Sequence, residues 1–229
     1  FVLLMIIYHA TYVSVLHGLL TIEFFRGFWW VFPRFIAAGF VTLSGWSLSA
    51  KNARGGCFRD YARRAAKLAV PALAVSLVSL IMFGKSFVFF GILHLLALSS
   101  ILAAPLLGRP VIALATGLGA LAAGMALGPL RFAWPWLAWL GFRPGELYPV
   151  DYLPLLPWFA WICFGASAYD FFGRRLKTAP EGRSVPISSG KAAFPLRTVL
   201  YLGRHSLIVY LAHLPILYGL AWLAAALFR

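Results

Sequence analysis

Histidines inside apolar stretches are the residues of this chain whose type and position best suit chemistry. His9, His94 and His213 each lie within a long apolar run, whereas His17 and His205 lie beside one. An imidazole near neutral pH can relay protons, act as a general base or carry an acyl group. Ionisable groups in a membrane interior are costly, about 2.5–3.5 kcal/mol for Arg or Asp at a helix centre. Such residues are therefore functional candidates.

The depth of these histidines favours a shared role. At 1.5 Å per residue, His94 lies roughly 10 Å from the outer end of its run and His213 roughly 13 Å from the inner end of its run. The alternative is that each histidine only forms a hydrogen bond between helices. Three histidines at similar depth on three helices favour at least one that takes part in chemistry.

Two other polar residues lie at or near the predicted outer ends of their apolar runs. Arg34 lies about five residues into the second apolar run, and Asp151 begins the sixth. We expect an outward-facing polar cavity with the histidines as its floor and these two residues at its rim. Alternatively, Arg34 extends to the outer headgroups and Asp151 caps its own helix. We assign Arg34, Tyr152 and Trp158 to substrate binding.

These residues need apolar helices to position them, and the composition supplies such helices. The chain has 229 residues, of which 62% are hydrophobic and 11% are charged. A soluble domain has about a quarter charged residues, so we predict an all-α integral membrane protein. It forms one domain, 1–229, a bundle of about seven transmembrane helices. The predicted spans are 1–16, 29–50, 67–83, 87–107, 110–128, 151–172 and 204–228. The first helix is predicted to be truncated at its N-terminus, since apolar residues begin at Phe1.

Basic residues indicate the orientation of the bundle. The segments 51–67 and 173–197 each carry six Lys or Arg residues, whereas the connections of opposite parity carry few. The positive-inside rule therefore makes both segments cytoplasmic loops, with the N-terminus inside and the C-terminus outside. The net charge of +14 is explained in this way, without a nucleic-acid partner. Arg59, Arg63 and Arg64 either orient the chain or hold an anionic cytosolic ligand. Arg204 is assigned similarly, with His205 beside it.

An aromatic segment and two cysteines are assigned structural roles. The aromatic segment 129–150 holds three tryptophans, which favour the headgroup level, and we place it at the outer face. Cys57 and Cys163 are predicted to be structural and unpaired. No residue spacing resembles a metal site or a Ser-His-Asp set, so no metal is expected.

Specific strings in the chain resemble a known family. These are "FVLLMIIYH", "FPRFIAAGFVTLSG", "FGILHLLALSSILAAPLL", "WLGFRPGELYPVDYLPLLPWF" and "LGRHSLIVYLAHLPIL". In this order, from Phe1 to about Leu217, they are similar to the bacterial branch of the heparan-alpha-glucosaminide N-acetyltransferase catalytic domain family. The style of the motifs points to a bacterial inner membrane.

The resemblance implies a transmembrane acyltransferase. Its members take an acetyl group from cytosolic acetyl-CoA, a co-substrate, and deliver it across the membrane to a sugar or glycan. A histidine carries the acetyl group or deprotonates the acceptor. By position in the motifs we prefer His9, with His17 as second choice, and His94, His213 and Asp151 in support. Arg59, Arg63, Arg64, Arg204 and His205 would then face the CoA.

The sequence leaves other functions, and the assembly state, open. The same histidines would suit a proton-coupled transporter or flippase, although such proteins often show an internal repeat, which we do not find. In a non-catalytic membrane protein the polar residues would only hold helices together. The lipid bilayer is the expected surrounding, and a homodimer is one of the assembly states left open.

Overall fold

The computed structural model is mainly helical in the part of the chain that it describes, which comprises residues 1–24, 26–132, 135–142, 144, 151–174, 201, 203 and 205–227. Those residues contain no β-strand. They include seven α-helices: α1 (Val2–Leu16), α2 (Gly27–Asn52), α3 (Phe58–Phe83), α4 (Ile92–Leu102), α5 (Pro110–Leu127), α6 (Leu155–Ala168) and α9 (Ser206–Leu227). The predicted all-α class with about seven helices is therefore confirmed.

Five helical segments are long and apolar enough to cross a membrane. They are Gly27–Asn52, Phe58–Ser86, Pro110–Leu127, Leu155–Gly173 and Ser206–Leu227. α1 and α4 are apolar but shorter. Because a bilayer core requires about 20 helical residues, these five segments make the chain a multi-pass membrane protein.

The predicted span 87–107 forms a shorter helix than expected because its first residues are extended. The hydroxyl of Ser76 donates to the carbonyl of Val88 at 2.6 Å, and Ser79 Oγ accepts from the Val88 N–H at 2.9 Å. These side chains satisfy backbone groups that a helix would bond internally. α4 therefore begins only at Ile92, with Gly91 as its N-cap.

The segment 51–67, expected as a loop, is mostly helical. α2 continues to Asn52, and α3 begins at Phe58. Asp60 stabilises this start, since its carboxylate accepts the Cys57 N–H at 3.1 Å and lies in the first turn. The following residues, "YARRAAKLA", are good helix formers. The basic side chains there thus project from a helix rather than a loop.

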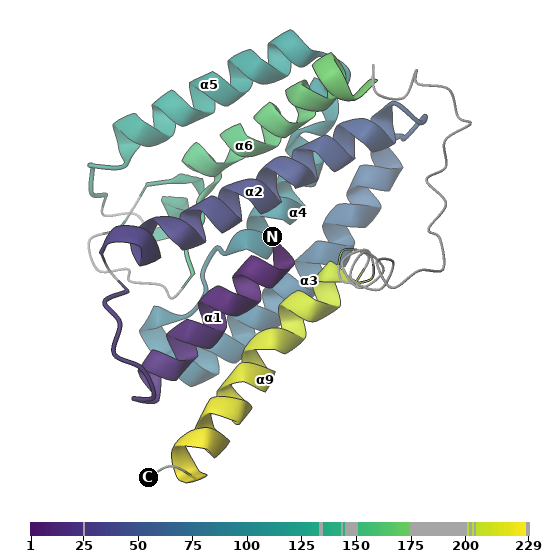
Figure 1. The fold of residues 1–229 in the computed structure, drawn as a ribbon. Coiled ribbons are helices and arrows are strands. Elements are labelled where there is room, and N and C mark those ends of the chain that lie inside the picture. The colour runs from purple at the N-terminus through teal and green to yellow at the C-terminus, as the bar shows by residue number, and fades with distance from the viewer. Residues whose placement is uncertain are drawn as a thin grey trace, which may run out of the picture. The chain divides into compact units, whose positions relative to one another are not determined.

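The chain divides into two compact units, and α2 continues from one into the other. Unit 1 comprises residues 1–37 and 181–229, and unit 2 comprises residues 38–180. In unit 1, α1 and α9 pack side by side (Figure 1). They run in the same direction, because His9 contacts His213 and His17 contacts Tyr218. This is the relative direction that the sequence predicts for the first and last spans.

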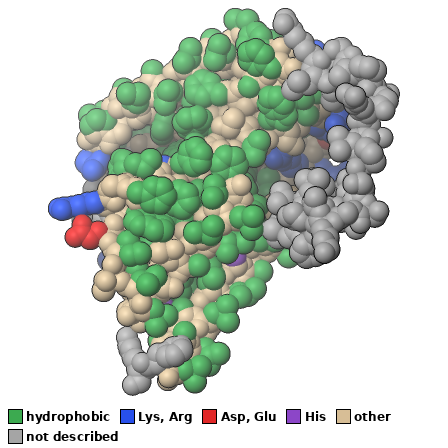
Figure 2. All heavy atoms as spheres, in the orientation of Figure 1, with side chains coloured by type: hydrophobic (Ala, Val, Ile, Leu, Met, Phe, Trp, Pro, Cys, Tyr) green, Lys and Arg blue, Asp and Glu red, His purple; other side chains and the backbone are tan. Residues whose placement is uncertain are grey.

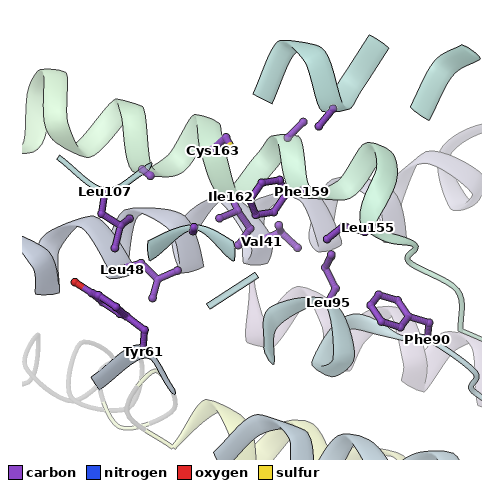
Figure 3. Close-up of a cluster of buried hydrophobic side chains, with 14 residues drawn as sticks. Val41, Leu48, Tyr61, Phe90, Leu95, Leu107, Leu155, Phe159, Ile162 and Cys163 are labelled. Carbon is purple, nitrogen blue, oxygen red and sulfur yellow. The ribbon is translucent and has the colours of Figure 1, made fainter. Parts of the chain in front are cut away.

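Helix α6 is central to unit 2 and packs closely through glycines. A Cβ at Gly45 of α2 would lie 2.0 Å from the carbonyl oxygen of Ile162, and one at Gly165 would lie 1.9 Å from that of Thr42. A Cβ at Gly124 of α5 would lie 2.5 Å from Pro157. Small residues of this kind let membrane helices approach closely. Figure 3 shows core side chains of α2 and α6 together with residues of α3, α4 and the adjoining connections.

The lipid-facing character of the helices is visible on the surface. Hydrophobic side chains cover much of the face in Figure 2. Large apolar residues remain highly exposed, among them Ile81 at 78%, Leu227 at 72% and Val70 at 71%. A soluble protein rarely exposes this much contiguous apolar surface, whereas a bilayer covers it.

Candidate functional site

Two histidines that are 204 positions apart in the sequence meet in unit 1. Nε2 of His213 lies 3.3 Å from Nδ1 of His9, and the ring centroids are 4.8 Å apart. His9 is half-buried on α1, and His213 is only 5% exposed on α9. We call this arrangement the histidine pair. The parallel packing of the first and last helices creates it.

Backbone carbonyls define the protonation of the pair. His9 Nδ1 lies 2.9 Å from the Met5 carbonyl, and His213 Nδ1 lies 2.6 Å from the Tyr210 carbonyl. A carbonyl accepts only, so each Nδ1 is assigned the proton from this network. His213 Nε2 is then unprotonated and accepts from His9 Nδ1–H. The nitrogen that remains with a lone pair and no hydrogen bond among the described residues is His9 Nε2.

Aromatic side chains pack against His9 at the middle of α1. The ring of Tyr8 packs edge-on against His9 at 5.2 Å and against Phe24 at 5.7 Å, and it stacks with Tyr12 at 6.4 Å. Tyr12 also borders a cavity of about 630 Å³. The cavity is lined by Tyr12, Val15, Leu16, Ile22, Glu23, Phe24 and Arg26. A mainly apolar cavity, with Glu23 and Arg26 in its lining, therefore begins about one helical turn along α1 from His9.

His94 lies in unit 2 and is fully hydrogen-bonded. Its Nδ1 accepts the Gly91 N–H at 3.3 Å, and its Nε2 lies 3.3 Å from Ser76 Oγ. The Ser76 hydroxyl already donates to a carbonyl, so Nε2–H must be the donor to Ser76. Both ring nitrogens are thus occupied in holding the start of α4 to α3. His94 is not at mid-span but at the third position of its helix.

Asp151 lies in the connection before α6, outside the span, and contacts α4 instead of its own helix. Its Oδ2 accepts the Ile92 N–H at 3.3 Å, at the positive end of the α4 dipole. The N-cap of α6 is Pro154. Burial raises the pKa of the Asp151 carboxyl to about 6. The motifs "GILH" and "VDYLP" meet here, since the Leu153 N–H also donates to the Phe90 carbonyl at 2.9 Å.

The three residues assigned to substrate binding have local partners. The Arg34 guanidinium lies 3.8 Å from the centroid of the Trp30 ring and donates to the Trp30 carbonyl, on its own helix. The Tyr152 hydroxyl donates to the Ala138 carbonyl at 2.7 Å. Trp158 packs against the core of unit 2. Their roles toward a substrate stay predictions.

The arginines assigned to the donor differ in their surroundings. Arg64 is half-buried and donates from Nη2 to Ser44 Oγ at 2.8 Å, whereas Arg59 and Arg63 are exposed. Arg204 lies outside the described residues. His205 Nδ1 lies 3.0 Å from the Tyr201 carbonyl, and its ring packs on Tyr201 at 4.3 Å.

His17, the second-choice histidine, ends α1. Its Nδ1 lies 2.9 Å from the Val13 carbonyl, and its ring lies edge-on to Tyr218 at 5.8 Å. It follows His9 by eight residues, roughly 12 Å along the axis. The structure therefore places the two candidate histidines at different levels of the same helix.

A buried carboxylate that was not singled out from the sequence organises one end of unit 2. Oδ2 of Asp170 accepts from Ser49 Oγ at 2.8 Å and from the Gly108 N–H at 2.9 Å. Its Oδ1 accepts from Arg174 Nε at 3.1 Å. We call these four residues the Asp170 cluster. An acid within the apolar run 151–172 was the signal that could have revealed it.

No group of three or more His, Cys, Asp or Glu residues close enough to hold a metal ion occurs among the described residues.

Comparison with known proteins identifies the family. The family model described as "Heparan-alpha-glucosaminide N-acetyltransferase, catalytic" matches residues 1–215. The chain belongs to this family, as the sequence motifs predicted, and it is accordingly a multi-pass membrane protein of an acetyltransferase family. No curated protein and no solved structure matches the chain.

Proposed function

We propose that this member of the heparan-alpha-glucosaminide N-acetyltransferase catalytic family transfers an acetyl group from acyl-CoA to a sugar or glycan on the opposite side of the membrane. Family membership supports the acetyl transfer. The observation that carries the choice of residue is the histidine pair, because it leaves one basic nitrogen, His9 Nε2, available for reaction.

His9 Nε2 serves either of two routes. In the covalent route it attacks the thioester carbonyl carbon, the C–S bond breaks, and the thiolate leaves and takes a proton from water. The acceptor oxygen or nitrogen then attacks the acetyl carbonyl carbon, and the bond from this carbon to Nε2 breaks, which regenerates His9. The proton of the acceptor neutralises the hydroxide that formed when the thiolate was protonated. In the direct route Nε2 takes the proton from the acceptor while the acceptor attacks the thioester carbonyl carbon. The C–S bond breaks, and the leaving thiolate receives the proton from His9.

His213 supports both routes through the second nitrogen of His9. Positive charge develops on the His9 ring when Nε2 gains an acetyl group or a proton. His213 Nε2 accepts a hydrogen bond from His9 Nδ1–H at 3.3 Å and can take that proton as the charge develops. A base oriented by a third group is the arrangement that activates nucleophiles in many enzymes. The Tyr210 carbonyl provides this third group by holding His213 Nδ1–H.

Arg64 is the donor-side residue that we favour among the three arginines of α3. A half-buried guanidinium has five N–H donors, and Ser44 accepts from only one of its nitrogens among the described residues. The remaining donors suit carbonyl or phosphate oxygens of an acyl-CoA. The exposed Arg59 and Arg63 add positive charge near the same helix start.

The decisive experiment combines binding with chemical labelling. The detergent-purified protein is titrated with acetyl-CoA, and peptides are then examined by mass spectrometry for an acetylated histidine. We expect saturable binding, a label on His9 in the covalent route, and loss of transfer but not of binding in His9→Ala. His17→Ala is the matched control, since His17 has the same Nδ1 contact with a carbonyl one turn earlier on the same helix.

Each result has a defined meaning. A label on His17, or full activity of His9→Ala, would overturn the assignment of His9. Binding without any label, with His9→Ala inactive, selects the direct route. Absence of acetyl-CoA binding by folded protein would overturn the acetyltransferase proposal and favour a histidine-dependent transporter instead.

A further inference from the structure

The Asp170 cluster joins three segments that the sequence places on the cytoplasmic side. Ser49 is near the end of α2, Gly108 connects α4 to α5, and Asp170 lies in the π-helical turn Tyr169–Gly173 that follows α6. The carboxylate side chain is only 1% exposed. It accepts hydrogen bonds on both oxygens, so its charge is satisfied without water.

The cluster fixes one arginine at the surface. Arg174 Nε and Nη2 both contact Asp170 Oδ1, at 3.1 and 3.0 Å, whereas its side chain is 50% exposed. Nη1 has no hydrogen-bond partner among the described residues. A planar guanidinium held through two of its nitrogens presents the third in a defined direction. Little conformational entropy is then lost when Nη1 binds an anion.

The surroundings of Arg174 favour an anion. A Cβ at Gly108, whose φ is +78°, would lie 3.2 Å from Asn52 Nδ2 and 3.5 Å from Arg174 Nη2. The side-chain nitrogens of Asn52 and Arg174 therefore both lie next to Gly108. Lys51, Arg54 and Arg109, all exposed, lie within five residues of this cluster in the chain.

We propose that Arg174, positioned by the buried Asp170, binds a phosphate group of the acyl-CoA donor. This inference rests on the proposed function, because it takes the donor to be an acyl-CoA. It assigns Arg174 to binding and Asp170 to positioning. A phosphate of an anionic lipid headgroup has the same chemistry, and the experiment separates the two sources.

The experiment compares two donors with Arg174→Gln. Acetyl-CoA and acetyl-pantetheine share the acetylated thiol arm, but only acetyl-CoA carries phosphates. Dissociation constants are measured by calorimetry on the full chain in nanodiscs of zwitterionic lipid. For Arg174→Gln we expect Kd for acetyl-CoA to rise about tenfold and Kd for acetyl-pantetheine to stay unchanged. Arg131→Gln is the matched control, since exposed Arg131 hydrogen-bonds to the Gly128 and Leu130 carbonyls alone among the described residues.

A second variant separates a loss of phosphate binding from a loss of folding. Arg174→Gln leaves the Asp170 charge without its partner, which destabilises a buried site. The double variant Asp170→Asn/Arg174→Gln removes both charges, and we expect it to show the same selective loss of acetyl-CoA affinity. Arg174→Lys keeps the charge but loses the planar fork, so its Kd should be intermediate.

The outcomes distinguish this inference from the proposed function. Failure of the wild-type protein to bind either donor would overturn the proposed function itself. Wild-type binding with equal weakening for both donors would make the Asp170 cluster purely structural and overturn the inference. Unchanged acetyl-CoA affinity, together with loss of the thermal stabilisation that added phosphatidylglycerol gives the wild type, would assign the site to a lipid headgroup and also overturn it.

Discussion

The two nitrogens of His9 have different environments, and the proposed chemistry depends on this difference. Nδ1 faces the Met5 carbonyl and His213, whereas Nε2 has no hydrogen bond among the described residues. Were His213 absent, the Met5 carbonyl would still hold Nδ1–H. The tautomer would therefore persist, and the loss would fall on the ability to accept the Nδ1 proton.

Substitution of His213 tests this role. We expect His213→Ala to slow single-turnover acetyl transfer about ten- to hundredfold, because no group would then take the Nδ1 proton as charge develops. His213→Gln supplies an amide oxygen that accepts a hydrogen bond but not a proton, and it should restore packing without restoring the rate. A rate for His213→Ala equal to that of the wild type would show that the pair is only a helix contact.

Asp151 should make stability depend on pH. Its pKa is raised by burial from 3.8 in the unfolded chain to about 6 in the folded protein. The folded state therefore binds more protons between these values, and the free energy of unfolding decreases as pH rises from about 4 to about 6. We expect Asp151→Asn to remove about 1–2 kcal/mol of this decrease. Thermal unfolding of both proteins across this pH range measures the effect. An equal dependence of stability on pH in the wild type and the variant would contradict the prediction.

The sequence predicted the residue types at the site better than their partners. His9 and His213 were expected at mid-membrane level, but their pairing depends on how α1 docks on α9, which hydropathy does not encode. His94 was expected beside them. Its place at the start of α4 follows from the hydroxyls of Ser76 and Ser79, which bind the backbone of Val88 and delay the helix.

At the level of helices, α6 depends on close backbone approach. A Cβ at Gly165 would lie 1.9 Å from the Thr42 carbonyl oxygen and 3.0 Å from the Trp46 backbone nitrogen. Backbone atoms cannot move aside as a flexible side chain can. Any side chain at Gly165 would therefore separate α6 from α2, and with them Asp170 from Ser49.

The prediction at this scale uses a glycine-to-alanine pair. We expect Gly165→Ala to lower the free energy of unfolding by at least about 2 kcal/mol through overpacking. Gly119→Ala in α5 is the control, because nothing lies within 4 Å of its Cβ position and alanine favours helix. Thermal unfolding in the same detergent measures both. Equal midpoints for the two variants would mean that α2 and α6 are not held together at Gly165.

Helix boundaries were less predictable than helix existence. Hydropathy located every long apolar segment, yet it placed Phe58 and the basic residues after it in a loop. Charged residues lower hydropathy without breaking a helix, so α3 begins at Phe58, in a first turn that contains Asp60, and extends beyond the apolar run. The Asp170 cluster was hidden for a related reason, since one acid barely changes the mean hydropathy of a span.

For the whole molecule, the proposed function requires the donor and acceptor ends to face opposite sides of the membrane. In unit 2, hydrogen bonds join Ser49, Gly108 and Asp170 at one end. Others join Ile92 with Asp151, and Val88 with Ser79, at the other. Segments that the sequence assigns to the same side are thus linked to one another. Which end is cytoplasmic rests on the positive-inside rule alone.

The cysteines provide a direct test of that orientation. Cys57 is exposed between α2 and α3, at the predicted cytoplasmic end, whereas Cys163 is buried at 1% exposure and should not react. We expect a membrane-impermeant maleimide to label the protein in inverted vesicles and not in right-side-out vesicles, with Cys57→Ser unlabelled in both. Labelling from the outside alone would reverse the bundle. Arg64 and Arg174 would then face away from cytosolic acyl-CoA, and acetyl transfer in the proposed direction could not occur.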